Sequence, residues 1–251
     1  MVTAEGYPLW AVPSARRSAV IVTVGNELTS GDIENSNAGW LARSLESLGC
    51  RVRLVASLPD DVDAIARFLR LHRNDADCVI VTGGLGGTPD DVTREGVAAA
   101  FEVECVLDEQ AARPLRARFG ARGLTAYAER WATLPRGAET LGNPLGGAPS
   151  FAVSEVYVLP GVPAEMRACF ESISGRFASD PIKQARLSYP LVESDLVEAL
   201  VEFSSRYGDV SLGSYPSFED GKREVELVLK SRDGARLAEA VAWLEAAIDA
   251  R

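Results

Sequence analysis

The sequence contains a single histidine, His72, and its four cysteines form no C-x-x-C pair. These absences exclude a zinc site built on paired histidines and any mechanism that needs two histidines. The cysteines at positions 50, 78, 105 and 169 stand mostly beside apolar residues, which predicts buried, reduced thiols. His72 stands near the predicted end of a helix, where a surface histidine is expected, and no G-x-S-x-G motif accompanies it.

Long apolar runs and excess positive charge are also missing. No window approaches the ~20 consecutive apolar residues of a membrane-spanning helix, so no membrane partner is expected. The chain carries 36 acidic and 26 basic residues, a net charge of -10, and this charge argues against a nucleic-acid partner. An acidic chain holds a phosphorylated ligand only where backbone N–H groups, a helix N-terminus or a divalent cation offset the repulsion.

The remaining composition is that of a globular protein, with 47% hydrophobic and 25% charged residues among 251. Residues 1–17 lack the apolar centre of a secretory signal, so we expect a flexible tail on a cytoplasmic protein. The length favours a medium domain followed by a small one. Apolar density falls near residues 174–181, which predicts domains at 18–175 and 181–251.

The first domain is predicted to be α/β. Ser18–Val24 is a continuous apolar run typical of a strand buried on both faces of a parallel sheet, and two further strand–helix units follow. We expect Asp60 to cap the second helix, and a helical stretch from Asp108 to break at Pro114. Residues 151–159 are typical of two short strands or a hairpin.

The second domain is predicted to be a small α+β domain with the order β-α-β-β-α. Its expected strands cover residues 184–189, 210–214 and 224–230, its helices cover 194–207 and 235–248, and Ser217–Lys222 is expected to be a turn. No G-x-x-G nucleotide-clamping loop occurs between its helices. A docking or dimerisation module is therefore expected, and with it a homo-oligomer.

The stretch from Thr82 to Asp91 is the most informative part of the chain. Thr82, Gly83, Gly84 and Gly86 follow a buried strand, and glycines there allow the backbone to approach a phosphate. The stretch matches neither the Walker nor the Rossmann fingerprint, and a plain turn whose Asp90 or Asp91 caps the next helix is the alternative. Beside a phosphate, the two aspartates would need a cation such as Mg²⁺ between them and the ligand.

Three other loops are compatible with the same ligand. Glu27 follows the first strand and is a candidate acceptor from a base or a ribose hydroxyl, while Asn37 is either a donor to the ligand or a helix cap. Two later loops, at residues 143–150 and 159–165, are rich in small residues. Four ligand-compatible loops at strand ends are more than are needed to connect the strands and helices. The further candidates in those two loops are Asn143, Gly146, Gly147, Ser150, Pro160, Gly161 and Glu165.

The ordered motifs resemble a known family. They are Gly25-x-Glu27-Leu28, Asn37, Thr82-Gly-Gly-Leu-Gly-x-Thr-x-Asp-Asp91-Val-Thr93, Gly-x-Ala-Pro at 146–149, and Leu-Pro-Gly-Val-Pro-x-Glu-Met at 159–166. Residues 18–175 resemble the molybdopterin-binding domain, in the form found at the N-terminus of the competence/damage-inducible protein A (CinA-like) family. The small second domain resembles the one that follows in that family.

The resemblance implies a three-layer α/β/α fold, a pterin or adenine nucleotide ligand, and metal-dependent cleavage of ADP-ribose-like pyrophosphates. Relatives elsewhere in the superfamily adenylylate molybdopterin. By the same resemblance, Asp91 matches the acidic residue assigned to metal binding and catalysis, and Asp90 is its neighbour. Positions 82, 83, 84 and 86 match the phosphate loop, and Glu27, Asn37, Gly161 and Glu165 match pocket positions.

The sequence departs from the family pattern at three places. Gly87 replaces a usual proline, Ser150 replaces a usual glycine, and Tyr127–Trp131 lacks the usual Lys-Gln-Ala stretch, which removes a cationic partner for phosphate. The sequence stops at Arg251, so the family's amide-hydrolysing domain is not expected. We therefore expect a metal-dependent nucleotide pyrophosphatase that uses Asp90 and Asp91, with molybdopterin binding or adenylylation and non-catalytic nucleotide binding as alternatives.

Overall fold

A computed structural model describes residues 17–120, 125–179, 182–219 and 222–249. Contacts between Cα atoms divide the chain into two units, one of residues 16–179 and the other built mainly from residues 180–251. The tail expected over residues 1–17 lies outside the described residues except for Arg17. No helix among the described residues has the length and apolar character needed to cross a membrane.

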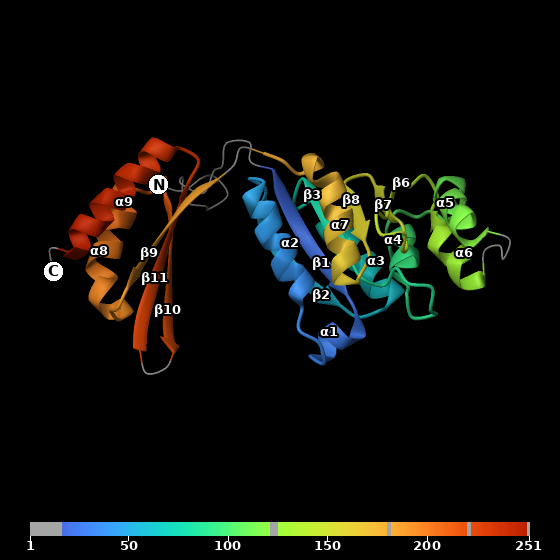
Figure 1. Ribbon diagram of the computed structural model, residues 1–251, viewed down its shortest axis with the longest axis horizontal. Helices are drawn as coiled ribbons and strands as arrows, with labels where there is room; N and C mark the ends of the chain where they lie inside the picture. The colour runs from blue at the N-terminus through green and yellow to red at the C-terminus, as the bar shows by residue number, and fades with distance from the viewer. Residues whose placement is uncertain (1–16, 121–124, 180–181, 220–221, 250–251) are drawn as a thin grey trace. The chain divides into compact units, whose positions relative to one another are not determined.

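The first unit is built on a six-stranded sheet (Figure 1) with the order β2-β1-β3-β8-β7-β6. Strands β2, β1, β3 and β8 are parallel, while β7 pairs with β8 and with β6 in antiparallel fashion. The predicted hairpin at 151–159 is thus formed by β7 and β8. The strands are β1 Ser18–Val24, β2 Arg51–Leu58, β3 Cys78–Thr82, β6 Glu139–Gly142, β7 Ser150–Val153 and β8 Val156–Leu159.

Helices connect these strands, and a separate small ladder joins β4 (Cys105–Leu107) to β5 (Thr133–Pro135). The helices are α1 Asn26–Ser30, α2 Ser36–Ser47, α3 Val62–His72, α4 Thr93–Ala100, α5 Glu109–Phe119, α6 Ala126–Ala132 and α7 Pro163–Ile173, and a 3-10 turn follows at Ser174–Arg176.

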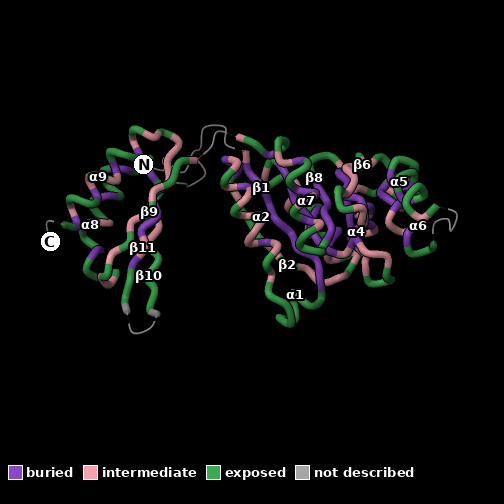
Figure 2. The backbone as a smooth tube through the Cα atoms, viewed as in Figure 1, coloured by how far each residue is buried: buried purple, intermediate pink, exposed green. Residues whose placement is uncertain are grey.

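Strand β1 shows why the unit has three layers. Successive side chains of a strand point to opposite faces of the sheet. Ala19 and Ile21 pack in the apolar cluster with α2 and α7, whereas Val20 and Val22 pack in the cluster with α3 and α4. All four are fully buried, and the buried strands run through the middle of this unit in Figure 2. The predicted α/β/α architecture is confirmed.

Two local expectations were wrong. Asp61, not Asp60, caps α3 by accepting the Ala64 N–H at 2.7 Å, and Asp60 instead accepts the Asn26 N–H at 2.8 Å. Pro114 does not break the helix that begins near Asp108, because α5 continues through it to Phe119. Its buried face, Ala111, Ala112 and Leu115, lies on both sides of the proline and holds the helix against the core.

The second unit has the predicted order β9 (Lys183–Tyr189), α8 (Glu193–Arg206), β10 (Ser211–Glu219), β11 (Lys222–Ser231) and α9 (Gly234–Asp249). Its antiparallel sheet has the order β10-β11-β9. One face, which includes Leu227 and Leu229, packs on Phe203 of α8 and Leu244 of α9. Strands β10 and β11 extend into the turn expected at 217–222, and only residues 220–221, outside the described part, lie between them.

The cysteines are free, as expected: Cys50, Cys78 and Cys169 are buried and Cys105 is half-buried. Burial raises the pKa of the Cys105 thiol to about 11, so this side chain stays protonated at neutral pH. His72 ends α3, and its Nδ1 lies 2.7 Å from a carboxylate oxygen of Asp75 at the surface.

Candidate functional site

A cavity of about 350 Å³ lies at the carboxyl ends of β1 and β3, a volume at the small end of known ligand sites. Three of the four predicted loops reach it, those after β1, β3 and β8. Its lining residues are Thr23, Val24, Gly25, Glu27, Leu28, Ile33, Glu34, Asn35, Ser36, Asn37, Asp60, Thr82, Gly83, Gly84, Asp90, Asp91, Gly161 and Pro163.

Gly83 and Gly84 need to be glycine. Both have positive φ, 105° and 61°, which L side chains rarely adopt. A Cβ on Gly83 would overlap the carbonyl oxygen of Val24, and one on Gly84 would overlap the hydroxyl of Thr93. The loop after β3 therefore lies directly against the end of β1, as expected from strands that end at the same edge of the sheet.

Thr93, the first residue of α4, donates hydrogen bonds to two carbonyl groups of this loop. Thr93 Oγ1 donates to the Gly83 carbonyl at 2.8 Å, and the Thr93 N–H donates to the Gly84 carbonyl at 3.2 Å. In a trans peptide the carbonyl and the following N–H point in opposite directions. The N–H of Gly84 consequently points away from Thr93, and it has no acceptor among the described residues. A loop that presents backbone N–H groups to a cavity suits an anion.

A buried arginine continues this arrangement. Arg94 is 2% exposed, and its Nη2 donates to the carbonyls of Leu85 and Gly86, the latter at 3.1 Å. Burial lowers the pKa of the guanidinium to about 10, so it stays charged at neutral pH. Arg94 was not identified from the sequence, although its position three residues after Asp91, where the glycine loop ends, could have indicated it.

Asp91 closes the loop from the other end. Its carboxylate accepts the N–H of Gly86 at 2.7 Å, the N–H of Thr88 at 2.9 Å and the Thr88 hydroxyl at 2.5 Å. Val92 is the N-cap of α4, and no side chain caps this helix, so neither Asp90 nor Asp91 serves as the helix cap. The Thr88 hydroxyl lowers the pKa of the exposed Asp90.

The cavity is acidic. Five carboxylates line it and no basic side chain does, among the residues the structure describes: Glu27, Glu34, Asp60, Asp90 and Asp91. The pKa of Asp60 is raised, first by burial and then by the charges of Glu27, Asp90 and Asp91, against the Asn26 N–H that lowers it. Such a set of carboxylates attracts a cation.

The carboxylates do not form a metal cage by themselves. Across the described ranges, no group of three or more His, Cys, Asp or Glu side chains is placed to hold a metal ion. Mg²⁺, however, is commonly held by one or two carboxylates together with the phosphates of a substrate. The lining fits a divalent ion that enters with a phosphate ligand, and it does not fit one bound by the protein alone.

Asn37 joins the loops after β1 and β8. Its Nδ2 donates to the Gly161 carbonyl at 2.8 Å, and its buried Oδ1 has no partner among the described residues. Asn35, not Asn37, is the cap of α2, since it accepts the Ala38 N–H at 3.1 Å. A Cβ on Gly161 would lie 3.1 Å from Gly83 Cα, so this third loop also packs closely on the glycine loop.

The fourth predicted loop lies elsewhere. Asn143 Nδ2 donates to Glu165 at 2.7 Å and Gly147 packs on the same carboxylate, but neither lines the cavity. The remaining predicted residues outside the lining are Gly86, Gly146, Ser150, Pro160 and Glu165. Gly86 holds Asp91, the Pro160 carbonyl accepts the Thr82 hydroxyl at 2.7 Å, and the buried Ser150 hydroxyl has no partner in the described part of the chain.

Asp60 and Asn35 were missed by sequence reasoning as site residues. Asp60 follows β2, and a carboxylate directly after a parallel strand was the available signal. Asn35 Nδ2 donates to Thr23 Oγ1 at 2.8 Å and to Ser57 Oγ at 3.0 Å, so it ties the ends of β1 and β2 to the start of α2.

Comparison with known proteins gives two matches to family models. Residues 20–178 match the family described as "Probable molybdopterin binding domain", and residues 181–251 match "FAD synthase, middle domain". The chain is 39% identical over 197 residues to a protein of Archaeoglobus fulgidus, an alignment that covers 78% of this chain and 85% of that one.

Two further similarities concern CinA-like proteins. A CinA-like protein of Frankia casuarinae is 36% identical over 250 residues, which cover 91% of this chain and 57% of the relative, so this chain spans little more than half of its length. Alignments with three Pyrobaculum proteins also cover 60 to 61% of the relatives. The crystal structure of CinA from Thermoplasma acidophilum, described as of unknown function, superimposes with a TM-score of 0.61 at 32% identity, over 65% of this chain and 100% of that one.

Proposed function

The chain belongs to the molybdopterin-binding domain family, and from that premise we propose that its cavity binds an adenine-containing pyrophosphate together with a divalent cation and hydrolyses it. The observation that carries the proposal is the meeting of two opposite features in one cavity. Gly84 of the glycine loop, whose N–H has no acceptor in the described part of the chain, lines the cavity together with the carboxylates of Glu27, Asp60 and Asp90. The first feature suits a phosphate group, and the second suits the cation that accompanies it.

The proposed reaction is hydrolysis of a phosphoanhydride in an ADP-ribose-like substrate. Water adds to one phosphorus atom, the bridging P–O bond breaks, and the products are AMP and a ribose phosphate. When bound, the cation neutralises charge on the phosphate oxygens, and Asp60, Asp90 and Asp91 are the side chains available to hold it. The glycine loop orients the phosphate and stabilises the charge that develops on its oxygens.

Asp91 has two roles in this proposal: it fixes the glycine loop, and it is available to the cation. Its carboxylate already accepts three hydrogen bonds from Gly86 and Thr88, so its first role is to fix the loop that receives the phosphate. Across the described residues, the amides of Gly86 and Thr88 donate to Asp91 and not to Asp90. We therefore expect Asp91→Asn to impair both ligand binding and turnover, and Asp90→Asn to impair chiefly the dependence on the cation.

Hydrolysis of ADP-ribose, measured with Mg²⁺ and with a chelator, tests the proposal. We expect turnover only with the cation, and a loss in Asp90→Asn and Asp60→Asn that the exposed α3 variant Asp63→Asn does not share. Turnover that is equal with and without a divalent ion would contradict the cation role. Unchanged turnover in Asp60→Asn would remove the cavity as the site.

Molybdopterin is the second candidate ligand, because the family model that matches residues 20–178 is described by that ligand. A molybdopterin adenylyltransferase would consume ATP only when molybdopterin is present, and this separates it from the hydrolase. Tight binding of ADP-ribose or molybdopterin without turnover under any divalent ion would instead indicate a nucleotide- or pterin-binding protein.

A further inference from the structure

Helix α6 packs on the glycine loop at Gly87. A Cβ on Gly87 would lie 2.5 Å from Cδ2 of the Tyr127 ring and 2.6 Å from the Tyr127 carbonyl oxygen. Those distances leave no room for any side chain at position 87. Gly87 and Tyr127, which lie at two of the places where the sequence departs from the family pattern, thus form one contact. In this contact the backbone of α6 lies directly against the loop.

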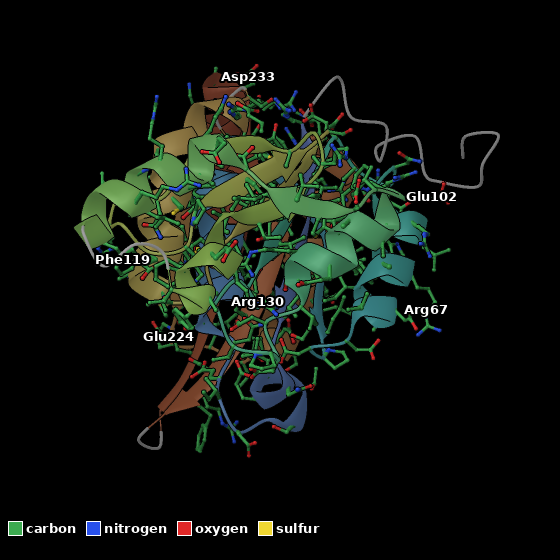
Figure 3. All side chains as sticks on the ribbon, turned by 90° about the vertical axis from the view of Figure 1, so that its right-hand side faces the viewer. Arg67, Glu102, Phe119, Arg130, Glu224 and Asp233 are labelled. Carbon is green, nitrogen blue, oxygen red and sulfur yellow. The ribbon has the colours of Figure 1, made fainter. Side chains whose placement is uncertain are left out.

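Arg130 of α6, labelled in Figure 3, extends this contact to Asp91, the last residue of the loop. Its Nη2 donates to the Asp91 carbonyl at 2.9 Å and to Glu95 Oε1 at 3.1 Å. Asp91 in turn holds Gly86 and Thr88 through its carboxylate. Asp91 therefore links the Arg130 guanidinium, bound at its backbone carbonyl, to the loop amides, bound at its carboxylate.

The ion pair between Arg130 and Glu95 adds little to the unfolding free energy. The side chains of Arg130 and Glu95 are 35% and 39% exposed, and ion pairs with such exposure contribute little to unfolding free energy. Two buried atoms of the pair, Arg130 Nε and Glu95 Oε2, have no partner in the described part of the chain. A side chain that adds little stability but holds the end of a ligand loop is a candidate for a role in binding.

We propose that Arg130 is a positioning residue for the phosphate loop, and this rests on the proposed function. By holding the Asp91 carbonyl, it keeps the Asp91 carboxylate on Gly86 and Thr88 and so fixes the loop before the ligand arrives. It also places a positive charge near Asp91, which belongs to a cavity whose charged lining side chains, in the described ranges, are all carboxylates. Arg130 does not line the cavity, so it acts on the loop through Asp91 and not on the phosphate directly.

The test compares Arg130→Gln with Arg130→Lys and with Arg116→Gln. Arg116 pairs with Glu109 on the surface of α5, so its variant removes an exposed arginine ion pair without contacting the loop. Both Arg130 bonds come from a single nitrogen, which a lysine ammonium can replace. We expect Arg130→Gln to weaken binding of ADP-ribose with Mg²⁺ on the order of tenfold, Arg130→Lys to restore it to within about threefold, and Arg116→Gln to bind as the wild type does.

The melting temperature without ligand separates positioning from stability. A purely structural arginine would lower the melting temperature in Arg130→Gln and leave the dissociation constant of the folded protein unchanged, and that result would overturn the proposal. So would equal binding by Arg130→Gln and Arg130→Lys.

Amide hydrogen exchange over residues 84–88 gives a readout that needs no ligand. We expect faster exchange in Arg130→Gln than in the wild type and in Arg116→Gln. If the wild type binds no ADP-ribose but the exchange still rises, the proposed function fails and the positioning role holds. If exchange in Arg130→Gln equals that of the wild type, the positioning role itself is refuted.

Discussion

Replacing Gly83 by alanine should damage both the fold of the first unit and its cavity. The residue has a φ of 105°, and a Cβ there would overlap the carbonyl oxygen of Val24. The obstacle is backbone rather than a flexible side chain, so it cannot move aside by changing rotamer. Either β1 or the loop must shift, and both form the wall of the cavity.

The size of the effect follows from two contributions. A left-handed backbone costs a residue with a Cβ about 1–2 kcal/mol. Forcing an extra methyl group into a packed site costs about 1–3 kcal/mol more. The loss in unfolding free energy should therefore be about 2–5 kcal/mol, which in a domain of this size lowers the melting temperature by roughly 5–15 °C.

Two other glycines provide matched controls. Gly31 has a φ of 84° but nothing within 4 Å of an added Cβ, so Gly31→Ala carries only the backbone cost, about 1–2 kcal/mol. Gly175 has neither a positive φ in that range nor a neighbour within 4 Å, so Gly175→Ala should leave stability nearly unchanged. Urea unfolding of the three variants, monitored by circular dichroism, gives the comparison.

The order of the three losses decides the argument. We expect Gly83→Ala to lose more than Gly31→Ala, and Gly31→Ala to lose more than Gly175→Ala. If Gly83→Ala and Gly31→Ala lose the same free energy, the close approach of the loop to β1 is refuted, and with it the wall of the cavity.

Three further predictions concern single side chains. Asp77→Asn should cost about 1 kcal/mol of unfolding free energy near neutral pH, because the carboxylate accepts the Ser18 hydroxyl at 2.8 Å and its N–H at 2.7 Å. These bonds lower the pKa of Asp77, so the stability they add is present above the unfolded-state pKa and is lost as pH falls through the folded-state pKa. The unfolding free energies of wild type and variant, measured in urea, should therefore converge in acid. A difference between them that stays constant with pH would contradict this. Arg94→Met should cost about 2–4 kcal/mol in the same assay, because the carbonyls of Leu85 and Gly86 lose the donor of a buried arginine. A loss under about 1 kcal/mol would show that these carbonyls found another donor. Asn37→Leu should weaken ADP-ribose binding, measured by calorimetry, by about tenfold, because the Gly161 carbonyl loses the hydrogen bond that holds its loop. The melting temperature should change little, because Gly161 is exposed. An unchanged dissociation constant would show that the Gly161 loop does not contribute to the site.

The sequence predicted most of the fold because its strongest signals are local. The apolar run Ser18–Val24 needs no knowledge of the rest of the chain to indicate a strand buried on both faces, and β1 is one. Asp60 and Asp61 show the limit of local reasoning, because either of two adjacent aspartates can cap a helix. The contact of Asp60 with the Asn26 N–H decides between them, and it joins residues 34 positions apart.

The same distinction explains which candidate site residues came together. The loops after β1, β3 and β8 meet because parallel strands end at one edge of the sheet. The loop of residues 143–149 connects β6 to β7, and the strand order puts β6 at the far edge of the sheet. Arg130 was out of reach for a similar reason, since 39 positions separate it from Asp91 and the irregular stretch between them hides the placement of α6.

The proposed function requires an acidic cavity to receive an anion, and the location of positive charge near the site bears on that requirement. Arg94 and Arg130 both hold carbonyl groups of the loop, and neither lines the cavity. A guanidinium inside the cavity would bind a phosphate directly and would make a metal ion unnecessary. In the proposed function, the arginines hold the carbonyl groups of the loop from outside the cavity while five carboxylates line it, so we expect a phosphate ligand to enter together with its own divalent cation.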